Sequence, residues 1–557
     1  MKKLFTSRRL WLLLTLMIVG GFLWAVSAWG YVETPQFSHS SGFYEESFTL
    51  EISAINAATI YYTLDGSSPT ENSLVYAGPI QIKNATQNPN NYAALPEVSI
   101  YFSDAYLQKR GESEYRIPDY PVDKCTVVRA IAVSPGGKVS DVASASYFVE
   151  QSPQDYGCNV ISLITDPANL FDSTTGIYVT GDLYEQYVAA GLINKQRQHV
   201  WWNTNYLQSG REWERPALLQ FFNQNGEKEH EQTVGVRIHG NFSRASLPRS
   251  LKFYARLDYD NYNTFTKPLF DSDYVPQTVT LFSGGNQLIT AAADVLVTDM
   301  VRELNFAAQR FSPYVLFING EYWGFYWLGE KYDEAYVAHY YNVQADNVVM
   351  IKDSKLETGE PGDELLYQNM VDFIYNNDMS AYENYQKACE LIDMDSFIDY
   401  YATMIYIARA VDWPGTNVAL WRTREVSPTS AYSDGKWRWM LFDCNSPCMR
   451  EDANMSQYAS LDSVIGADAL FQSLWNSDIF RKTFEQRILY IGENCFAPEK
   501  VDAFIDSYTE EMKPILKKRW ERFFGKENTA EQQYEEMMTS HSLFFQRRLA
   551  VVRSWFE

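Results

Sequence analysis

The hydrophobic pattern changes period along this 557-residue chain, and the change limits the folds open to it. Between residues 33 and 148, stretches such as FTLEISA and ATIYYTLDG alternate apolar and polar residues, which predicts short strands. From about residue 364, apolar residues recur at helical spacing in ELLYQNMVDFIYNN and MDSFIDYYATMIYIARAV. We therefore predict a multi-domain protein with an Ig-like β-sandwich at 33–150 and an α+β domain at 151–557.

The first 32 residues have the pattern of an export signal or a membrane anchor. Four basic residues, at positions 2, 3, 8 and 9, precede an uncharged apolar run at 10–32 that is long enough to cross a bilayer. Basic residues in front of such a run keep that end in the cytoplasm, so we expect the rest of the chain to be extracytoplasmic. Val26-Ser27-Ala28 is an acceptable cleavage site, and both a cleaved signal peptide and an uncleaved anchor remain open.

The overall charge excludes one class of partner. A formal charge of −23 and a pI near 4.8 argue against nucleic acid, which requires clustered Lys and Arg. Hydrophobic residues make up 46% of the chain, so composition predicts buried cores rather than disorder.

Cysteine and histidine spacings argue against a zinc site. The pair Cys444 and Cys448 has no second pair or nearby His to complete four ligands, so a local disulfide or two packed thiols explains it better. No two of the six His fall in H-x-x-x-H spacing. The phosphate-binding loops G-x-x-x-x-G-K-[ST] and G-x-G-x-x-G are also absent from the sequence.

Within the first folded region, residues 59–82 and 125–149 resemble the sandwich modules appended to chitobiase and hexosaminidase-type enzymes. Between these halves lies an Asn-rich and Tyr-rich insertion, predicted to be a long hairpin or loop at about 83–122. Tyrosines of such a module can bind sugar faces, but Tyr61, Tyr62 and Tyr76 fit strand packing better. We assign no site to this module.

The stretch 412–445 carries the strongest chemical pattern. Asp412 and Asn417 have the D-x-x-x-x-N spacing in which an acid orients an attacking hydroxyl and an amide oxygen holds a metal ion. Asp443 follows an apolar strand. Each residue also has an ordinary explanation: Asp412 before Trp-Pro suits a helix cap, and Asp443 suits a turn. Only the ordered set favours catalysis.

Six motifs together resemble the CotH kinase family of spore-coat proteins. They are GVRIHG at 235–240, SLKFYAR at 250–256, FINGEYWGFY at 317–326, EKYD at 330–333, DWP at 412–414 and WRWMLFD at 437–443. The resemblance implies an atypical protein-kinase-like fold, ATP with Mg²⁺ or Mn²⁺, and phosphoryl transfer to Ser or Thr of a protein substrate.

The resemblance also implies residue roles. Asp412 matches the catalytic acid, and Asn417 and Asp443 match the metal ligands. Trp437 matches an aromatic that packs on adenine, with Tyr326 as its partner from the opposite lobe. Lys252 is the candidate phosphate cation and Glu330 the acid that holds it; Arg249 and Lys331 remain alternatives to Lys252.

Two positions depart from the family pattern. Asn445 stands where relatives commonly have a second acid, and an amide oxygen can coordinate a cation without supplying charge. Ala293-Asp294 stands where relatives usually have Arg-Asp. A pseudokinase is therefore an open alternative.

Three functions remain open from the sequence. The first is an extracytoplasmic Ser/Thr protein kinase that acts on secreted, surface or spore-coat proteins. The second is a non-catalytic surface protein that binds cell-wall glycan or assembly partners. The third is a transferase on the same fold that moves the nucleotidyl group.

Overall fold

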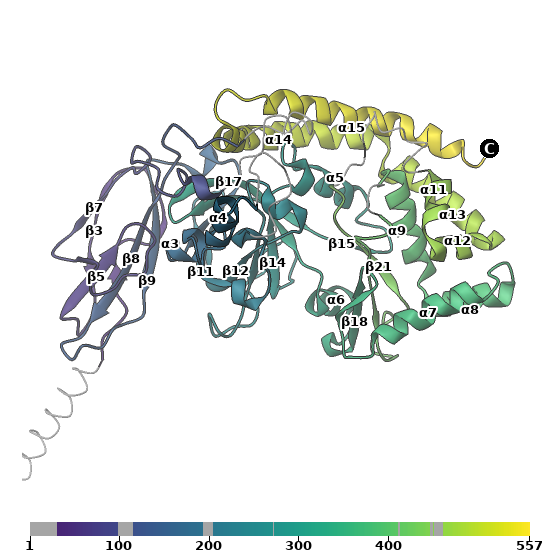
Figure 1. The fold of residues 1–557 in the computed structure, drawn as a ribbon, viewed down its shortest axis with the longest axis horizontal. Helices are drawn as coiled ribbons and strands as arrows, with labels where there is room; N and C mark the ends of the chain where they lie inside the picture. The colour runs from purple at the N-terminus through teal and green to yellow at the C-terminus, as the bar shows by residue number, and fades with distance from the viewer. Residues whose placement is uncertain are drawn as a thin grey trace, which may run out of the picture.

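The computed structural model describes residues 31–98, 115–192, 204–270, 272–409, 413–445, 449 and 460–557. The predicted export segment lies outside these ranges except for its last two residues, and Cys448 of the predicted cysteine pair also lies outside them. Among the helices that the structure describes, none is both long and apolar enough to cross a membrane. A β module forms one end of the molecule and helices form the other (Figure 1).

The N-terminal module is a small sandwich. A five-stranded sheet in the order β2-β9-β8-β5-β6 packs against the strand pair β3–β7 around Leu50, Ile82, Val128 and Tyr147, while β1 pairs with β4. The alternating patterns place apolar residues between the layers. The strands are β1 Gln36–Phe37, β2 Gly42–Tyr44, β3 Phe48–Leu50, β4 Ile52–Ser53, β5 Thr59–Thr63, β6 Leu74–Val75, β7 Ile80–Ile82, β8 Thr126–Val133 and β9 Ala143–Val149.

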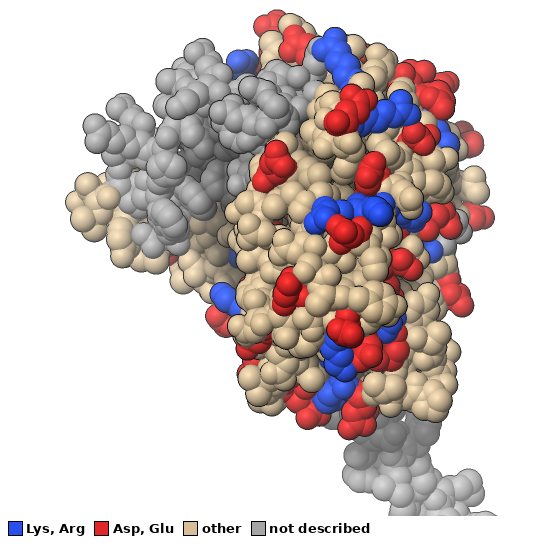
Figure 2. Space-filling view, turned by 90° about the vertical axis from the view of Figure 1, so that its right-hand side faces the viewer, with Lys and Arg blue, Asp and Glu red and all other residues tan. Residues whose placement is uncertain are grey.

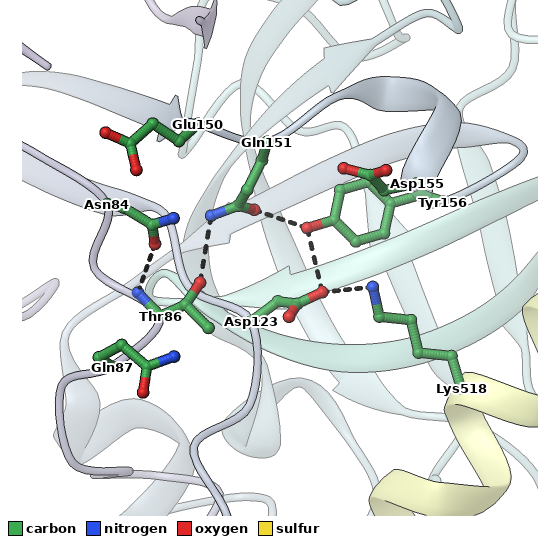
Figure 3. A pocket seen from close by; sticks show the side chains of 9 residues that line it. All are labelled: Asn84, Thr86, Gln87, Asp123, Glu150, Gln151, Asp155, Tyr156 and Lys518. Carbon is green, nitrogen blue, oxygen red and sulfur yellow. Dashed lines mark hydrogen bonds and ion pairs between the residues drawn. The ribbon is translucent and has the colours of Figure 1, made fainter. Parts of the chain in front are cut away.

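The described parts of the insertion pack against the next domain. The buried carboxylate of Glu321 accepts hydrogen bonds from the backbone N–H groups of Asn91, Tyr92 and Ala93, at 2.6, 3.0 and 2.7 Å. Nearby, Asp123 forms an ion pair with Lys518 at the rim of a polar pocket of about 410 Å³ (Figure 3). The module is therefore fastened to the body by buried polar contacts.

A closed seven-stranded barrel follows, in the order β10-β11-β12-β13-β14-β17-β16. Only the β10–β16 pair is parallel among these neighbours. The strands are β10 Asn159–Ile164, β11 Arg215–Phe222, β12 Lys228–Ile238, β13 Leu251–Tyr254, β14 Thr278–Phe282, β16 Phe311–Ile318 and β17 Glu321–Glu330. Short helices α3 Pro167–Phe171, α4 Asp182–Ala189 and α5 Ala293–Met300 lie in its connections.

A second five-stranded sheet, in the order β15-β21-β20-β18-β19, lies between the barrel and the helical end (Figure 1). Its strands are β15 Ala307–Ala308, β18 Val348–Lys352, β19 Lys355–Thr358, β20 Ala419–Thr423 and β21 Arg438–Leu441. The helices around it are α6 Glu334–Tyr341, α7 Glu364–Asn376, α8 Tyr382–Leu391, α9 Met394–Tyr406, α11 Leu461–Ala467, α12 Ala469–Trp475 and α13 Asp478–Tyr490.

Two long C-terminal helices, α14 Pro498–Phe524 and α15 Ala530–Arg553, run along the barrel and the helical end (Figure 1). Buried arginines fasten them to both parts. Arg519 on α14 donates to the carbonyl oxygens of Ser283 and Phe325, and Arg548 on α15 donates to those of Ile405 and Tyr406. The helix pair α14 and α15 therefore joins the barrel to the helical end.

The predicted fold class is confirmed, because a β module precedes a mixed α+β region. One helix differs in detail. The helical spacing of MDSFIDYYATMIYIARAV covers residues 394–411, but α9 is shorter, and its cap is Asp393, which accepts from the backbone N–H of Ser396. The helix ends at Tyr406, and Ala408 takes positive φ just after it.

Candidate active site

Lys352, Asn417 and Asp443 lie at one edge of the second sheet, where β18 and β21 end and β20 begins. Lys352 ends β18 and pairs with Ala419, the first residue of β20, which in turn pairs with Met440 near the end of β21. Asn417 lies two residues before the start of β20, and Asp443 lies two residues after the end of β21, so both lie near this edge. The Nζ of Lys352 lies 4.8 Å from the ring centre of Phe442, beside Asp443.

The loop that carries Asn417 is held by backbone contacts to a neighbouring turn. Asp353 and Val418 exchange hydrogen bonds, since the N–H of Val418 donates to the Asp353 carboxylate and the N–H of Asp353 donates to the Val418 carbonyl. Asn417, Asp443 and Asp353 all take positive φ, a conformation that Asn and Asp tolerate better than most residues. The two hydrogen bonds between Asp353 and Val418 therefore fix the loop that carries Asn417.

The barrel contributes a cluster of cations close to this edge. Lys252 lies on the outer face of β13, opposite Arg237 on β12. Burial, and then the charges of Lys331, Arg237 and Lys352, lower the pKa of Lys252 to about 7. Burial, and then the charges of Lys252, Lys352, Arg244 and Lys331, lower the pKa of His239 and keep its imidazole neutral at pH 7. The charges of a polyphosphate would relieve this repulsion.

Asp443 belongs to a polar network that reaches the barrel lobe. Asn445 donates through Nδ2 to Asp443 at 3.0 Å and to Asp294 at 2.8 Å. Asp294 lies in the first turn of α5, where burial and the neighbouring Asp443 raise its pKa to about 7. The buried guanidinium of Arg409 donates to the Asp443 carbonyl at 3.1 Å and lies 3.5 Å from its carboxylate.

This network places a cation near Asp294, although Ala293 stands where relatives usually have an Arg. Ala293 is buried in the core and carries no charge, so it does not supply the cation that an Arg at this position would bring. Arg409, on the segment after α9, lies close enough to Asp294 to lower the pKa of its carboxyl against the effect of burial. A cation is therefore supplied to the acid pair from another part of the chain.

The predicted pairing of Lys252 with Glu330 is not found. Lys252 is opposite Thr280, which is opposite Gly329, while Glu330 is opposite Val279. Since directly opposed residues point to the same face of a sheet, Lys252 and Glu330 point to opposite faces. Glu330 instead accepts from the Tyr340 hydroxyl at 2.5 Å and the Arg310 N–H at 2.8 Å.

The two predicted adenine-stacking rings lie in protein cores instead. Tyr326 is 0% exposed, and its pKa is raised by burial and by Tyr178 on the barrel side. Trp437 is also 0% exposed and packs edge-on against Tyr367 of α7. Neither ring has free surface on which a base could stack, so the structure does not bring them together as a nucleotide clamp.

Burial distinguishes the candidate phosphate cations from one another. Arg249 is 0% exposed, with its guanidinium 3.8 Å from the ring centre of Tyr206 and 5.0 Å from that of Tyr178, so it is a core residue. Lys252 and Lys331 remain as the barrel's cations. Asp412 lies outside the described residues, between Arg409 and Trp413.

Lys352 and Arg409 were not identified from the sequence. Both are single basic residues in apolar surroundings, and only strand pairing and the end of α9 place them beside Asp443. One signal was available: Lys352-Asp353-Ser354 ends a predictable strand in a polar turn, which is a frequent position for functional side chains.

The donor set suits a hard divalent cation. The carboxylate of Asp443, whose side chain is 32% exposed, and the amide oxygen of Asn417 are the oxygen ligands that magnesium and manganese accept. In the part of the chain that the structure describes, no three His, Cys, Asp or Glu side chains form a metal-binding group. Phosphate oxygens of a nucleotide would have to complete the coordination.

The arrangement defines a class of protein: a two-lobed α+β protein with lysines on a barrel and hard-oxygen side chains on the facing sheet edge. The family model of the CotH kinase protein matches residues 236–552, more than half of the chain. This protein therefore belongs to the CotH kinase family. A second model, Fn3 associated, matches residues 48–147. No individually curated protein matches the sequence.

Proposed function

We propose that the protein is an ATP-dependent protein kinase that phosphorylates Ser or Thr hydroxyls of secreted or surface proteins. Family membership implies a kinase and its use of ATP. One observation carries the proposal furthest: Lys352, Asn417 and Asp443 share one sheet edge, close to Lys252 and Lys331 of the barrel. Cations and hard oxygens in one place are what a metal-bound triphosphate requires.

The chemistry assigns a role to each group. The oxygen of the acceptor hydroxyl forms a bond to the γ-phosphorus as the bond from that phosphorus to the β–γ bridging oxygen breaks. Asp412 receives the proton of the hydroxyl, as its match to the family's catalytic acid implies. Lys252, Lys331 and Lys352 would neutralise charge on the phosphates, and Asn417 and Asp443 would hold Mg²⁺ or Mn²⁺, which would supply further charge neutralisation.

We propose an extracytoplasmic location, because four basic residues precede the apolar run at 10–32. Whether this segment is cleaved can be read from the N-terminal sequence of the protein recovered from its native host. A mature chain that begins near residue 29 would support a signal peptide, and an intact N-terminus in the membrane fraction would support an anchor.

The full chain, incubated with Mn²⁺ and ATP, tests the activity. We expect the label of γ-³²P-ATP to appear on Ser or Thr, and Asp443→Ala to reduce the rate at least about a hundredfold because a metal ligand is lost. Asp462→Ala is the matched control, since Asp462 is exposed on α11.

The same assay separates the alternatives. Transfer of label from α-³²P-ATP would contradict the kinase proposal and favour a nucleotidyl transferase. If neither label is transferred and ATP does not change the melting temperature, the protein is a binding protein, and cell-wall glycan becomes the ligand to test.

A further inference from the structure

A groove of about 670 Å³ runs between α14 and α15, the two long C-terminal helices. Its lining side chains come from residues 502–510 of α14 and 535–543 of α15. The helices are antiparallel, since Thr509 Oγ1 lies 3.0 Å from the Tyr534 hydroxyl while Ser542 donates to Asp502 at 2.6 Å. Side chains of adjacent helices normally interdigitate at high density, so this groove is space that the pair leaves open to another molecule.

The floor of the groove is apolar. Ile505 is 9% exposed and Met538 is 3% exposed, and the half-buried Leu543 adds a third apolar side chain to the lining. A surface of this kind can take up the aliphatic stem of a long side chain whose charged end stays at the rim. The floor therefore suits Lys or Arg better than a short polar residue.

The rim of the groove is acidic. No Lys or Arg is found among the described residues that line it, but there are four acids: Asp502, Asp506, Glu510 and Glu535. Two of the four are occupied by contacts within the protein. Asp502 accepts from the hydroxyl of Ser542, and Glu535 forms an ion pair with Lys513. The other two acids remain for a ligand.

Asp506 and Glu510 are those two acids. Both are exposed, and neither forms an ion pair with a residue that the structure describes. Because they are four residues apart on one helix, their Cβ atoms lie about 6 Å from each other. Alternate residues of an extended chain are about 6–7 Å apart and point to the same side. Two basic residues in such a chain would therefore each meet one carboxylate.

The size and lining of the groove narrow the class of ligand, which the net charge of −23 alone would not do. A polyanion is excluded by the acidic rim. A bare metal ion has no use for an apolar floor, and the described residues contain no metal-binding group of three acidic, His or Cys side chains. From residue 502 to residue 510 the helix rises about 12 Å, the length of three or four residues of extended chain.

We propose that the groove between α14 and α15 binds a basic segment of a protein partner, with Lys or Arg at alternate positions of an extended stretch. Asp506 and Glu510 pair with the two cationic groups, and Ile505 and Met538 contact the aliphatic stems. The inference goes beyond the proposed kinase activity and does not depend on it, because the described residues that line the groove include none of the candidate site.

Isothermal titration calorimetry of the full chain with a capped hexapeptide of alternating Arg and Ala tests the inference. We expect one binding site whose affinity falls as salt is raised. The double substitution Asp506→Asn with Glu510→Gln should weaken binding at least about tenfold, because two ion pairs are lost. The matched control is Glu511→Gln with Glu536→Gln, which removes the same charge from exposed positions of the same helices outside the groove and should change the affinity less than about twofold.

A second peptide and a melting temperature complete the test. A capped peptide with three Arg separated by two Ala each carries the same charge at a spacing of about 10 Å, and it should bind at least about fivefold more weakly. Both double variants should melt within about 2 °C of the wild type, since all four substituted side chains are exposed. A change in binding then reports on the groove and not on folding.

The outcomes distinguish a specific groove from general attraction to an acidic protein. Equal weakening by the two double variants, equal affinities for the two peptides, or no binding by the wild type would each overturn the inference. A loss confined to the Asp506 and Glu510 pair supports it whether or not phosphate is transferred, because the titration contains no ATP.

Discussion

Lys252 lies on the outer face of β13 near three other cations, and its ammonium group is largely removed from water. Burial and like charges both favour the neutral amine, so the pKa of Lys252 falls to about 7. An unfolded chain has no such cluster, and there the lysine titrates at about 10.4. Between these pH values the unfolded state binds more protons than the folded state. The free energy of unfolding therefore rises with pH, because the cost of burying Lys252 falls.

Lys252→Met removes this titration and should therefore stabilise the protein in the absence of nucleotide. We expect the melting temperature to rise relative to wild type at about pH 6.5, and the gain to shrink toward about pH 9.5, because the folded-state lysine is then already neutral and removing the proton from the unfolded-state lysine costs less at the higher pH. The substitution should also reduce the stabilisation by ATP. Lys355→Met, at an exposed position on β19, is the control, and an equal gain at both pH values would contradict the prediction.

At the scale of elements, the helices behind the second sheet depend on side chains that cap their ends. Asp468 precedes α12 and accepts from the N–H groups of Leu470 and Phe471 at 2.9 and 3.0 Å. It also accepts from the hydroxyl of Tyr401 on α9 at 2.6 Å. One carboxylate therefore both starts α12 and joins it to the helix that leads to the site.

Asp468→Ala should expose the start of α12 and weaken its contact with α9. We expect a loss of about 1–3 kcal/mol in local stability from the missing cap and the unpaired tyrosine hydroxyl. Hydrogen exchange at the amides of Leu470 and Phe471 should accelerate accordingly. Asp462→Ala on α11 should change exchange little, and equal effects of the two substitutions would argue against this role of Asp468.

At the scale of the whole molecule, acidic and basic side chains intermingle on the helical end, in keeping with a soluble acidic surface (Figure 2). The site differs, because Lys252, Lys331 and Lys352 gather where the barrel approaches the second sheet. The N-terminal module is fastened on the far side of the barrel, through Glu321 and the Asp123–Lys518 ion pair.

Glu321→Ala should loosen the module from the barrel without changing the active site. The buried N–H groups of Tyr92 and Ala93 and the part-buried N–H of Asn91 would lose their acceptor, at a cost of about 1–3 kcal/mol for each buried group left unsatisfied. Limited proteolysis should then cut within residues 83–98 faster than in wild type, while kinase activity is retained. Glu499→Ala, exposed on α14, is the comparison; unchanged cleavage in Glu321→Ala would refute the contact's importance.

The sequence by itself determined the order of β and α regions, because the period of apolar residues follows directly from strand and helix geometry. It also determined the family, since six separate motifs occur in the expected order. Asn417 and Asp443 could be selected in this way because each motif is local in the chain.

Only the tertiary structure decided which side chains meet. Strand register turns Lys252 and Glu330 to opposite faces of the barrel wall, and a shift of one residue would have reversed this. Packing buries Tyr326, Trp437 and Arg249 in cores, and strand pairing brings Lys352 to the edge that Asp443 shares. Such contacts join residues far apart in the chain, so local patterns do not encode them.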